Sequence, residues 1–261
     1  MRVGVAGCGE MGLPMAEALA DGGFDLLGYD LKSLAAPFMA DRAAFWAHAE
    51  LAFSIVRDIP ETEALLFGEI PLVEAPNLRV LAICSTLAPS YVRSLRARVP
   101  PEITLLDTPM SGAPVGARER RLTFMVGGEP AEVDRIRPML DAMGSRVMHL
   151  GPLGAGMTAK VLNNLIAASS VAATRTALAW GQAAGLEPDT LRALFEVSSG
   201  HSWVSANWDQ IEWFQEGYDP ANTMGILVKD LESARDAAPD GASDALAQTL
   251  IDVLRDLSPD A

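Results

Sequence analysis

The sequence is poor in cysteine and lacks the residue spacings that are typical of metal sites. Its two cysteines, Cys8 and Cys84, lie far apart without a C-x-x-C pairing, and its three histidines are isolated, with no H-E-x-x-H motif. These absences argue against a zinc site or a thiol redox motif. We therefore expect no metal cofactor, and two small buried thiols in a protein of a reducing compartment.

Long apolar runs and excess positive charge are also missing. No segment approaches the ~18 apolar residues of a membrane span, and no charged leader with a cleavage site precedes the first apolar segment. The 34 acidic and 20 basic residues give a net charge of −14, which repels nucleic acids and anionic membranes. We expect a cytoplasmic protein that partners neither nucleic acid nor membrane.

A glycine-rich turn follows the first apolar segment. Gly7, Gly9 and Gly12 have the spacing G-x-G-x-x-G, and an amphipathic helix follows. In that pattern Gly7 allows a tight turn, Gly9 lets a pyrophosphate approach the backbone, and Gly12 lets the helix pack closely on the strand. Asp30 ends the second apolar segment, near the ~20-residue spacing of a carboxylate that holds the ribose hydroxyls. The pattern predicts a dinucleotide site; the alternative is a βαβ turn that binds nothing.

Strands and helices alternate over residues 1–153, which predicts a mostly parallel sheet covered on both faces. The predicted strands are Arg2–Ala6, Asp25–Tyr29, Phe53–Val56, Arg79–Ile83, Ile103–Asp107, Thr123–Gly127 and Arg146–Leu150. The predicted helices are Leu13–Ala20, Ser33–Glu50, Glu61–Phe67, Ser90–Arg98 and Pro130–Met143.

From residue 154 onward the apolar residues recur at helical spacing only. The first helix, over Ala155–Ala184, contains no proline and at 1.5 Å per residue would span about 45 Å. Further helices are predicted at Pro188–Val197, Ser202–Gln215, Met224–Ala238 and Ala242–Leu257. The expected fold class is an α/β Rossmann-type domain over residues 1–153 followed by an all-α domain over residues 154–261.

Two short segments carry residues suited to binding and catalysis. In Asp107–Ala113 a strand ends in a small-residue turn, where Ser111 and the following amides could grip a carboxylate; the alternative is a plain β-turn. Lys160 and Asn164 are four residues apart and share one helical face. Apolar neighbours would lower the pKa of Lys160, as general acid–base chemistry near neutral pH requires; the alternative is a solvated lysine.

Five motifs resemble, in order, those of the β-hydroxyacid dehydrogenase family. They are GCGEMGLPMA at Gly7–Ala16, CSTLAP at Cys84–Pro89, DTPMSG at Asp107–Gly112 with its continuation at Leu122–Gly128, the lysine segment Gly154–Asn164, and KDL at Lys229–Leu231. The first alone would indicate only a Rossmann domain, whereas the five span nearly the whole chain. The resemblance implies hydride transfer between a nicotinamide and a small 3-hydroxy acid, or its semialdehyde in reverse.

The resemblance also implies a role for individual positions. Lys160 is the expected acid–base residue at the alcohol oxygen, and Asn164 is expected to orient that oxygen. The expected substrate-binding residues are Ser111, Gly112 and Ala113. The expected cofactor-binding residues are Gly7, Gly9, Glu10, Met11, Gly12, Asp30, Ser85, Thr86 and Lys229.

The chain departs from the family pattern in three places. Ala113 stands where a second glycine is frequent. The arginines Arg118, Arg120 and Arg121 could recognise a second anionic group of the substrate; the alternative is a solvated loop. The segment beyond Lys229 is shorter than usual, which leaves open a dinucleotide-binding protein without turnover. A second alternative is an imine reductase; such enzymes usually lack the lysine, so Lys160 favours alcohol chemistry.

Cofactor choice and assembly follow from the same residues. The charge of Asp30 should repel a 2′-phosphate, which predicts NAD rather than NADP, although Lys32 lies close enough in sequence to reach a phosphate. The long apolar helix and the tryptophans after it predict a homodimer, or a dimer of dimers, built through residues after about 155.

Overall fold

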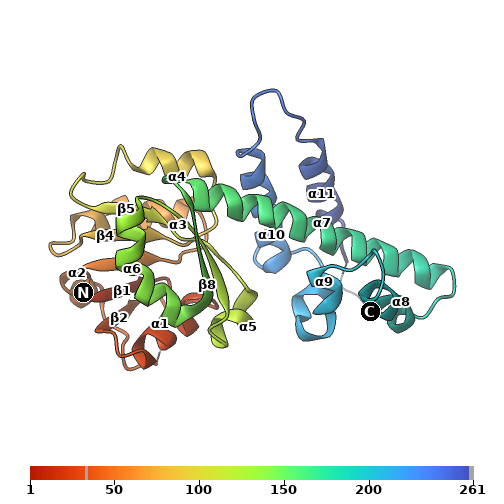
Figure 1. Ribbon diagram of the computed structural model, residues 1–261, viewed down its shortest axis with the longest axis horizontal. Helices are drawn as coiled ribbons and strands as arrows, with labels where there is room; N and C mark the ends of the chain where they lie inside the picture. The colour runs from red at the N-terminus through yellow and green to blue at the C-terminus, as the bar shows by residue number, and fades with distance from the viewer. Residues whose placement is uncertain (33–34, 259–261) are drawn as a thin grey trace. The chain divides into compact units, whose positions relative to one another are not determined.

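The computed structural model describes residues 1–32 and 35–258. The chain divides into two compact units, Met1–Lys160 and a second unit that begins at Val161. All the described strands belong to the first unit (Figure 1). The helix α7 (Ala155–Ala183) begins in the first unit and continues into the second.

The first unit is built around a mostly parallel sheet. Its described strands are β1 (Val3–Ala6), β2 (Leu26–Tyr29), β3 (Leu51–Ser54), β4 (Val80–Ile83), β5 (Thr104–Asp107), β6 (Met110–Ser111), β7 (Leu122–Gly127) and β8 (Gly144–Gly151). The order is β2-β1-β3-β4-β5-β7-β6, with β8 beside β7. Strands β1 to β5 are parallel, while β7 is antiparallel to β5 and β6. The predicted Rossmann-type sheet is confirmed, and β1, β3, β4 and β5 end at one edge.

Helices cover both faces of this sheet. One face packs against α1 (Gly12–Asp21), α5 (Ala113–Arg118) and α6 (Pro130–Met143). The other face packs against α2 (Arg42–His48), α3 (Ile59–Phe67), the short 3-10 helix η1 (Leu72–Glu74) and α4 (Pro89–Leu95). This arrangement explains why the central strands read as continuous apolar runs, since neither face of the sheet meets water.

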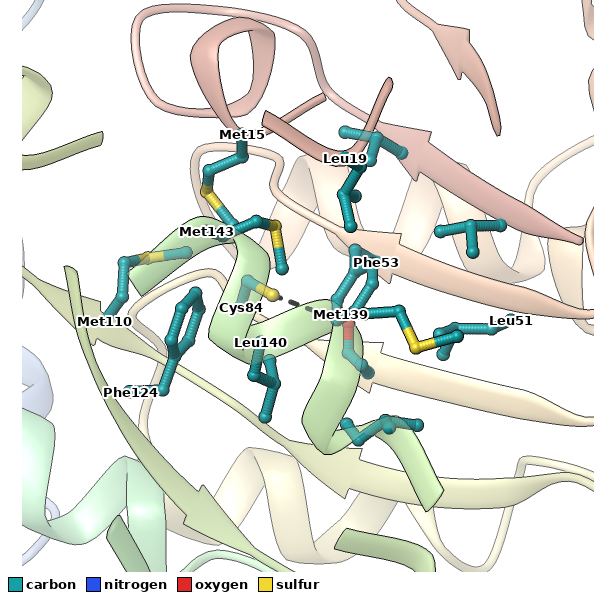
Figure 2. Packing of buried hydrophobic residues seen from close by; sticks show 14 of the residues in the cluster. Met15, Leu19, Leu51, Phe53, Cys84, Met110, Phe124, Met139, Leu140 and Met143 are labelled. Atoms are coloured by element: carbon teal, nitrogen blue, oxygen red, sulfur yellow. Dashed lines mark hydrogen bonds between the residues drawn. The ribbon is translucent and has the colours of Figure 1, made fainter. Parts of the chain in front are cut away.

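Side chains of each central strand alternate between the two faces. In β3, Phe53 belongs to the cluster under α1 and α6, and Ala52 belongs to the cluster under α2 to α4. Figure 2 shows Met15 of α1 and Met139 and Met143 of α6 gathered on the face of Phe53. Full burial of one such side chain contributes ~1.5–3 kcal/mol, so these two clusters supply most of the driving force for folding of the unit.

Several elements of the first unit differ from the sequence prediction. The helix predicted at Ser33–Glu50 is confined to α2; Ser33 and Leu34 lie outside the described residues, and residues 35–41 are not helical. Pro37 disfavours helix for the residue before it, and Asp41 caps α2 by accepting from the N–H of Ala44 at 2.8 Å. The third strand lies two residues earlier than predicted, and β6 and α5 were not predicted.

The second unit is helical, as predicted. Beyond α7 it contains α8 (Pro188–Glu196), α9 (Trp203–Ala206), the 3-10 helices η2 (Trp208–Gln210) and η3 (Glu212–Gln215), α10 (Thr223–Arg235) and α11 (Ala245–Arg255). Its core joins α7, α9, α10 and α11 around Trp208 and the fully buried Phe214. The single helix predicted at Ser202–Gln215 is wrong, because the side chain of Asn207 donates to the carbonyl of Trp203 at 2.8 Å and ends α9 after one turn.

Several large apolar side chains of the second unit remain on its surface. Trp180 is 74% exposed and Val197 is 84% exposed, and α8 has no buried residue. Among the described residues, none of the helices combines the length and the hydropathy that crossing a membrane requires.

Candidate functional site

The glycine-rich turn between β1 and α1 is shaped by backbone contacts. Gly7 has φ +93°, which side chains rarely adopt. A Cβ on Gly12 would lie 1.8 Å from the carbonyl oxygen of Gly7, so the start of α1 can approach β1 only without a side chain there. Gly9 is different, because a Cβ there would meet no atom within 4 Å. Protein packing therefore does not require a glycine at position 9, which fits open space for a bound pyrophosphate.

Asp30 ties this turn to the end of β2. Its Oδ2 accepts from the N–H of Cys8 at 2.8 Å, and its Oδ1 accepts from the N–H of Lys32 at 2.8 Å. Burial, together with the Asp30 charge, raises the pKa of the Cys8 thiol to about 12, so this thiol stays neutral. Glu10 is exposed, and Met11 packs against the core.

Polar side chains follow β4 and β5 at the same edge of the sheet. Ser85, directly after β4, is buried and its Oγ lies 3.5 Å from the carbonyl oxygen of Ser54 at the end of β3. Cys84 Sγ lies 3.1 Å from Thr108 Oγ1, the dashed contact in Figure 2, and burial raises the pKa of Cys84 to about 12. Thr86 is half-buried beside them in sequence. The parallel register places these residues at the edge that carries the glycine-rich turn.

The segment around Ser111 is a strand followed by a helix rather than a plain turn. Ser111 ends β6, Gly112 has φ +138°, and Ala113 begins α5 with φ +57°. The left-handed conformation costs a non-glycine residue ~1–2 kcal/mol, so a glycine would fit position 113 with less strain. Of the three arginines that follow, Arg120 pairs with Asp21 and Arg121 with Glu119, while Arg118 is exposed at the end of α5.

Asp107 fixes the first turn of α7, a role that the sequence did not reveal. Its carboxylate is fully buried and accepts from the N–H of Gly154 at 2.7 Å and of Met157 at 2.5 Å. Burial raises the pKa of this carboxyl, against the lowering by these two hydrogen bonds. The N–H of Leu87 also donates to the sulfur of Met157 at 3.3 Å. Lys160 follows Met157 within one helical turn, so the clamp sets the position of that lysine.

A buried carboxylate in the second unit joins two of the predicted site residues. Asp230, on α10, is 2% exposed, and its Oδ2 accepts from Asn164 Nδ2 at 2.6 Å. Its Oδ1 lies 2.8 Å from Nζ of Lys229. Asn164 itself is 7% exposed and stands one turn beyond Lys160 on α7.

The structure therefore groups the predicted residues within each unit. In the first unit the glycine-rich turn and Asp30 are in contact, and in the second unit Asn164 and Lys229 share Asp230. The two missed residues lie in motifs that contain predicted ones: Asp107 opens DTPMSG, which contains Ser111, and Asp230 follows Lys229 in KDL. A carboxylate inside an otherwise apolar or small-residue motif was the available signal. Across the described ranges, no three His, Cys, Asp or Glu side chains gather as metal ligands.

Two protein-family descriptions match the chain almost end to end. The NAD-binding domain of 6-phosphogluconate dehydrogenase matches residues 2–151. The NAD-binding domain of NADP-dependent 3-hydroxyisobutyrate dehydrogenase matches residues 154–252. The first match ends, and the second begins, next to the turn that precedes α7.

Curated proteins and solved structures give the same grouping. The NAD-dependent L-serine dehydrogenase of Pseudomonas aeruginosa is 33% identical, over 93% of this chain and 87% of its own length. The 3-hydroxyisobutyrate dehydrogenase of the same organism is 36% identical, over 76% of this chain and 70% of its own. The structure of Mycobacterium tuberculosis 3-hydroxyisobutyrate dehydrogenase with L-serine superposes with a TM-score of 0.78 at 25% identity, over 97% of this chain and 92% of that one.

Proposed function

The chain belongs to the β-hydroxyacid dehydrogenase family, and from this premise we propose that it moves a hydride between NAD and the hydroxyl-bearing carbon of a small 3-hydroxy acid. It is an oxidoreductase acting on CH–OH groups, and the reverse direction reduces the matching semialdehyde. The observation that carries the proposal is the placement of Lys160 directly after the clamped first turn of α7, with Asn164 one turn further on.

The cofactor is NAD, and the first unit has the features that suit it. Bound NAD supplies the hydride acceptor, and the protein supplies placement and charge. We assign the pyrophosphate to the turn that contains Gly9 and the ribose hydroxyls to Asp30, whose carboxylate already faces that turn. A second negative charge on a 2′-phosphate would meet this carboxylate, which disfavours NADP. The remaining turn residues, Gly7, Glu10, Met11 and Gly12, are assigned to the cofactor, and Ser85 and Thr86 are assigned to the nicotinamide.

The proposed chemistry balances one proton and one hydride. Neutral Lys160 takes the hydroxyl proton while the hydrogen on the same carbon leaves as hydride for the nicotinamide. Asn164 donates a hydrogen bond to the oxygen that loses the proton. The substrate carboxylate is assigned to Ser111, Gly112 and Ala113, and Lys229 to the cofactor or substrate. General acid–base assistance of this kind contributes ~10²–10⁴-fold in rate.

The two alternatives fit less well. An imine reductase needs no residue that removes an alcohol proton, and such enzymes usually lack a lysine at the position of Lys160. A dinucleotide-binding protein without turnover would have no reason to keep Lys160, Asn164 and Lys229 together. The curated relatives named above are dehydrogenases of hydroxy acids, which also favours alcohol oxidation.

We further propose that the protein assembles through its second unit. An apolar groove of about 420 Å³ lies between α7 and α11, lined by Ser169, Ala172, Ala173, Thr176, Ala177, Trp180, Leu246, Leu250 and Val253. The small residues of α7 allow close approach of another helix, and the exposed Trp180 offers a large apolar anchor. We propose a cytoplasmic homodimer, or a dimer of dimers. We also propose that the dinucleotide-binding domain ends at residue 153 and that the helical substrate and dimerisation domain begins at residue 154.

A panel assay tests the proposed function. The purified protein is mixed with NAD or NADP and with 3-hydroxyisobutyrate, L-serine and other small 3-hydroxy acids, and absorbance of the reduced nicotinamide is followed. At least one acid should be oxidised, with a higher kcat/KM for NAD than for NADP. Reduction of a cyclic imine without oxidation of any hydroxy acid would contradict the proposal, and tighter binding of NADP would contradict the cofactor assignment.

A further inference from the structure

Asp230, on α10, is a carboxylate buried inside the second unit. A lone buried carboxylate destabilises a fold unless it is paired and hydrogen-bonded. Its two partners in the second unit are Asn164 and Lys229, from motifs far apart in sequence. Oδ1 is buried, lies 2.8 Å from Nζ of Lys229, and accepts no hydrogen bond from the residues that the structure describes. An apolar residue would fill this position at lower cost, so filling space does not explain the carboxylate.

The contact with Asp230 determines which way the Asn164 amide faces. A carboxylate only accepts hydrogen bonds, so the NH2 group of Asn164 must face Oδ2, 2.6 Å away. The amide oxygen then faces Asn163, whose Nδ2 donates to it at 3.2 Å. Turning the amide by half a rotation would bring two lone pairs to 2.6 Å in a buried place and would set two NH2 groups against each other. The Asp230 carboxylate therefore selects this orientation, and the Asn163 amide, which can donate or accept, is turned to match it.

We propose that Asp230 is a positioning residue for the reaction: it holds the Asn164 amide so that the second N–H of that amide donates to the substrate oxygen. The assignment rests on the proposed function for the identity of that oxygen. As the hydroxyl proton leaves, negative charge develops on the oxygen, and a donor stabilises it whereas an amide oxygen would repel it. The direction of the Asn164–Asp230 hydrogen bond, and not only its presence, is then essential for rate.

Exchanging the side chains of residues 164 and 230 separates the direction of their hydrogen bond from its presence. Asp230→Asn removes the one-way selection, since an amide at 230 can donate or accept. The double variant Asn164→Asp/Asp230→Asn restores an amide–carboxylate pair with its direction reversed. Glu232→Gln is the matched control, because Glu232 is an exposed carboxylate on the same helix that pairs with Arg255 at the surface. Each variant is assayed with the hydroxy acid that the wild type oxidises, and its Tm is measured.

We expect Asp230→Asn to lose about 10-fold or more in kcat, and the exchanged pair to lose about 10²-fold or more. The exchanged pair should recover the Tm that Asn164→Asp alone loses. The control Glu232→Gln should retain the wild-type kcat. An exchanged pair with near wild-type kcat would overturn the proposal, because direction would not matter. Loss of Tm in Asp230→Asn without loss of kcat at a temperature where it is folded would also overturn it.

A second measurement does not depend on turnover. The chain has five asparagines, so selective ¹⁵N labelling gives a simple spectrum of side-chain NH2 groups. The Asn164 pair, identified by its loss in Asn164→Asp, should show one downfield, slowly exchanging proton that moves upfield in Asp230→Asn and not in Glu232→Gln. An Asn164 side-chain signal whose chemical shift is the same in Asp230→Asn as in the wild type would contradict the proposed orientation of the Asn164 amide. If the wild type oxidises no hydroxy acid, the proposed function fails while this spectrum still decides the orientation.

Discussion

The two units hold their proposed functional groups in different ways. In the first unit the proposed dinucleotide site is shaped mainly by the backbone: a left-handed Gly7, the side-chain-free approach of Gly12 to Gly7, and the N–H of Cys8, which donates to Asp30. In the second unit the groups are side chains, Asn164 and Lys229, joined by a third side chain, Asp230. Binding geometry in the first unit is therefore part of the fold itself, whereas in the second it depends on side-chain contacts.

The units also differ in how completely they cover their apolar surface. The central strands β1, β3 and β4 of the first unit are buried on both faces, whereas the second unit leaves Trp180, Leu194, Val197 and Leu246 more than half exposed. Substitutions at the close-packed glycines of the first unit should consequently change binding and stability together, and substitutions of the exposed apolar side chains of the second should change assembly with the fold intact.

The largest expected effect belongs to the side chain that moves the proton. Lys160→Ala should lower kcat by ~10²–10⁴-fold while NAD affinity, measured by titration of protein fluorescence, stays close to wild type. Lys160→Arg should restore little, because a guanidinium keeps its proton, and Asn164→Ala should cost less than Lys160→Ala. Turnover of Lys160→Ala near the wild-type rate on a verified substrate would make this lysine structural and would contradict the proposed mechanism.

A pair of glycine substitutions tests the backbone-held site. Gly12→Ala places a Cβ against the oxygen of Gly7, and overpacking of this kind costs ~1–3 kcal/mol, so both Tm and NAD affinity should fall. Gly9→Ala is the matched variant, since its Cβ meets no protein atom within 4 Å; it should weaken NAD binding with little change in Tm. Equal effects of the two variants on Tm would show that the turn is held by something other than the Gly12–Gly7 approach.

Assembly is the next effect in size. Trp180→Ser should weaken the dimer by about 2 kcal/mol, which is the contribution of a buried aromatic anchor at an interface. It should not lower the Tm of the monomer, because Trp180 is exposed and is not part of the core. Sedimentation or light scattering over a dilution series would measure this change. Ile70→Ser is the control, because Ile70 is 49% exposed in the first unit. A wild type that is monomeric at roughly micromolar concentration would contradict the proposed use of the exposed apolar face.

The smallest effect concerns a surface ion pair of the first unit. The hydrogen bond from Arg98 holds the pKa of Glu63 below its ordinary value of 4.5, with help from Tyr91. A lowered pKa means that this pair stabilises the fold above pH 4.5 and that the contribution is lost as pH falls through the folded-state value. Glu63→Gln should therefore lower stability in urea at neutral pH by no more than ~1 kcal/mol, and the difference from wild type should vanish in acid.

Much of the fold could be predicted from periodicity alone. Helix α6 has the bounds that the sequence predicted, because its apolar residues recur at helical spacing after a proline that suits a first turn. Helix α5 was missed because glycine and proline in a run of small residues also describe a turn. The helix predicted at Ser202–Gln215 fails for a local reason: the Asn207 side chain takes a carbonyl that the next turn would need.

The site could be predicted only as far as its motifs reach. Gly7, Gly9, Gly12 and Asp30 follow from spacing, because the βαβ unit brings them together locally. The amides of Gly154, Met157 and Asn164 that donate to Asp107 and Asp230 are 47 or more residues away from them in sequence, and no local pattern indicates which buried amide a carboxylate will meet. The roles assigned to Lys160, Ser111 and Lys229 stay predictions until the variants are measured.

Helix α7 limits where the chain can gain or lose residues in the course of evolution. Its start is fixed by the buried Asp107, and Lys160 and Asn164 face the same way only because four residues separate them. A single inserted residue between them would turn Asn164 by about 100° away from Lys160 and away from Asp230. Length variation is therefore excluded between Gly156 and Asn164, whereas the turn at Gly185 can accept it, because it lies beyond the end of α7 and outside these contacts.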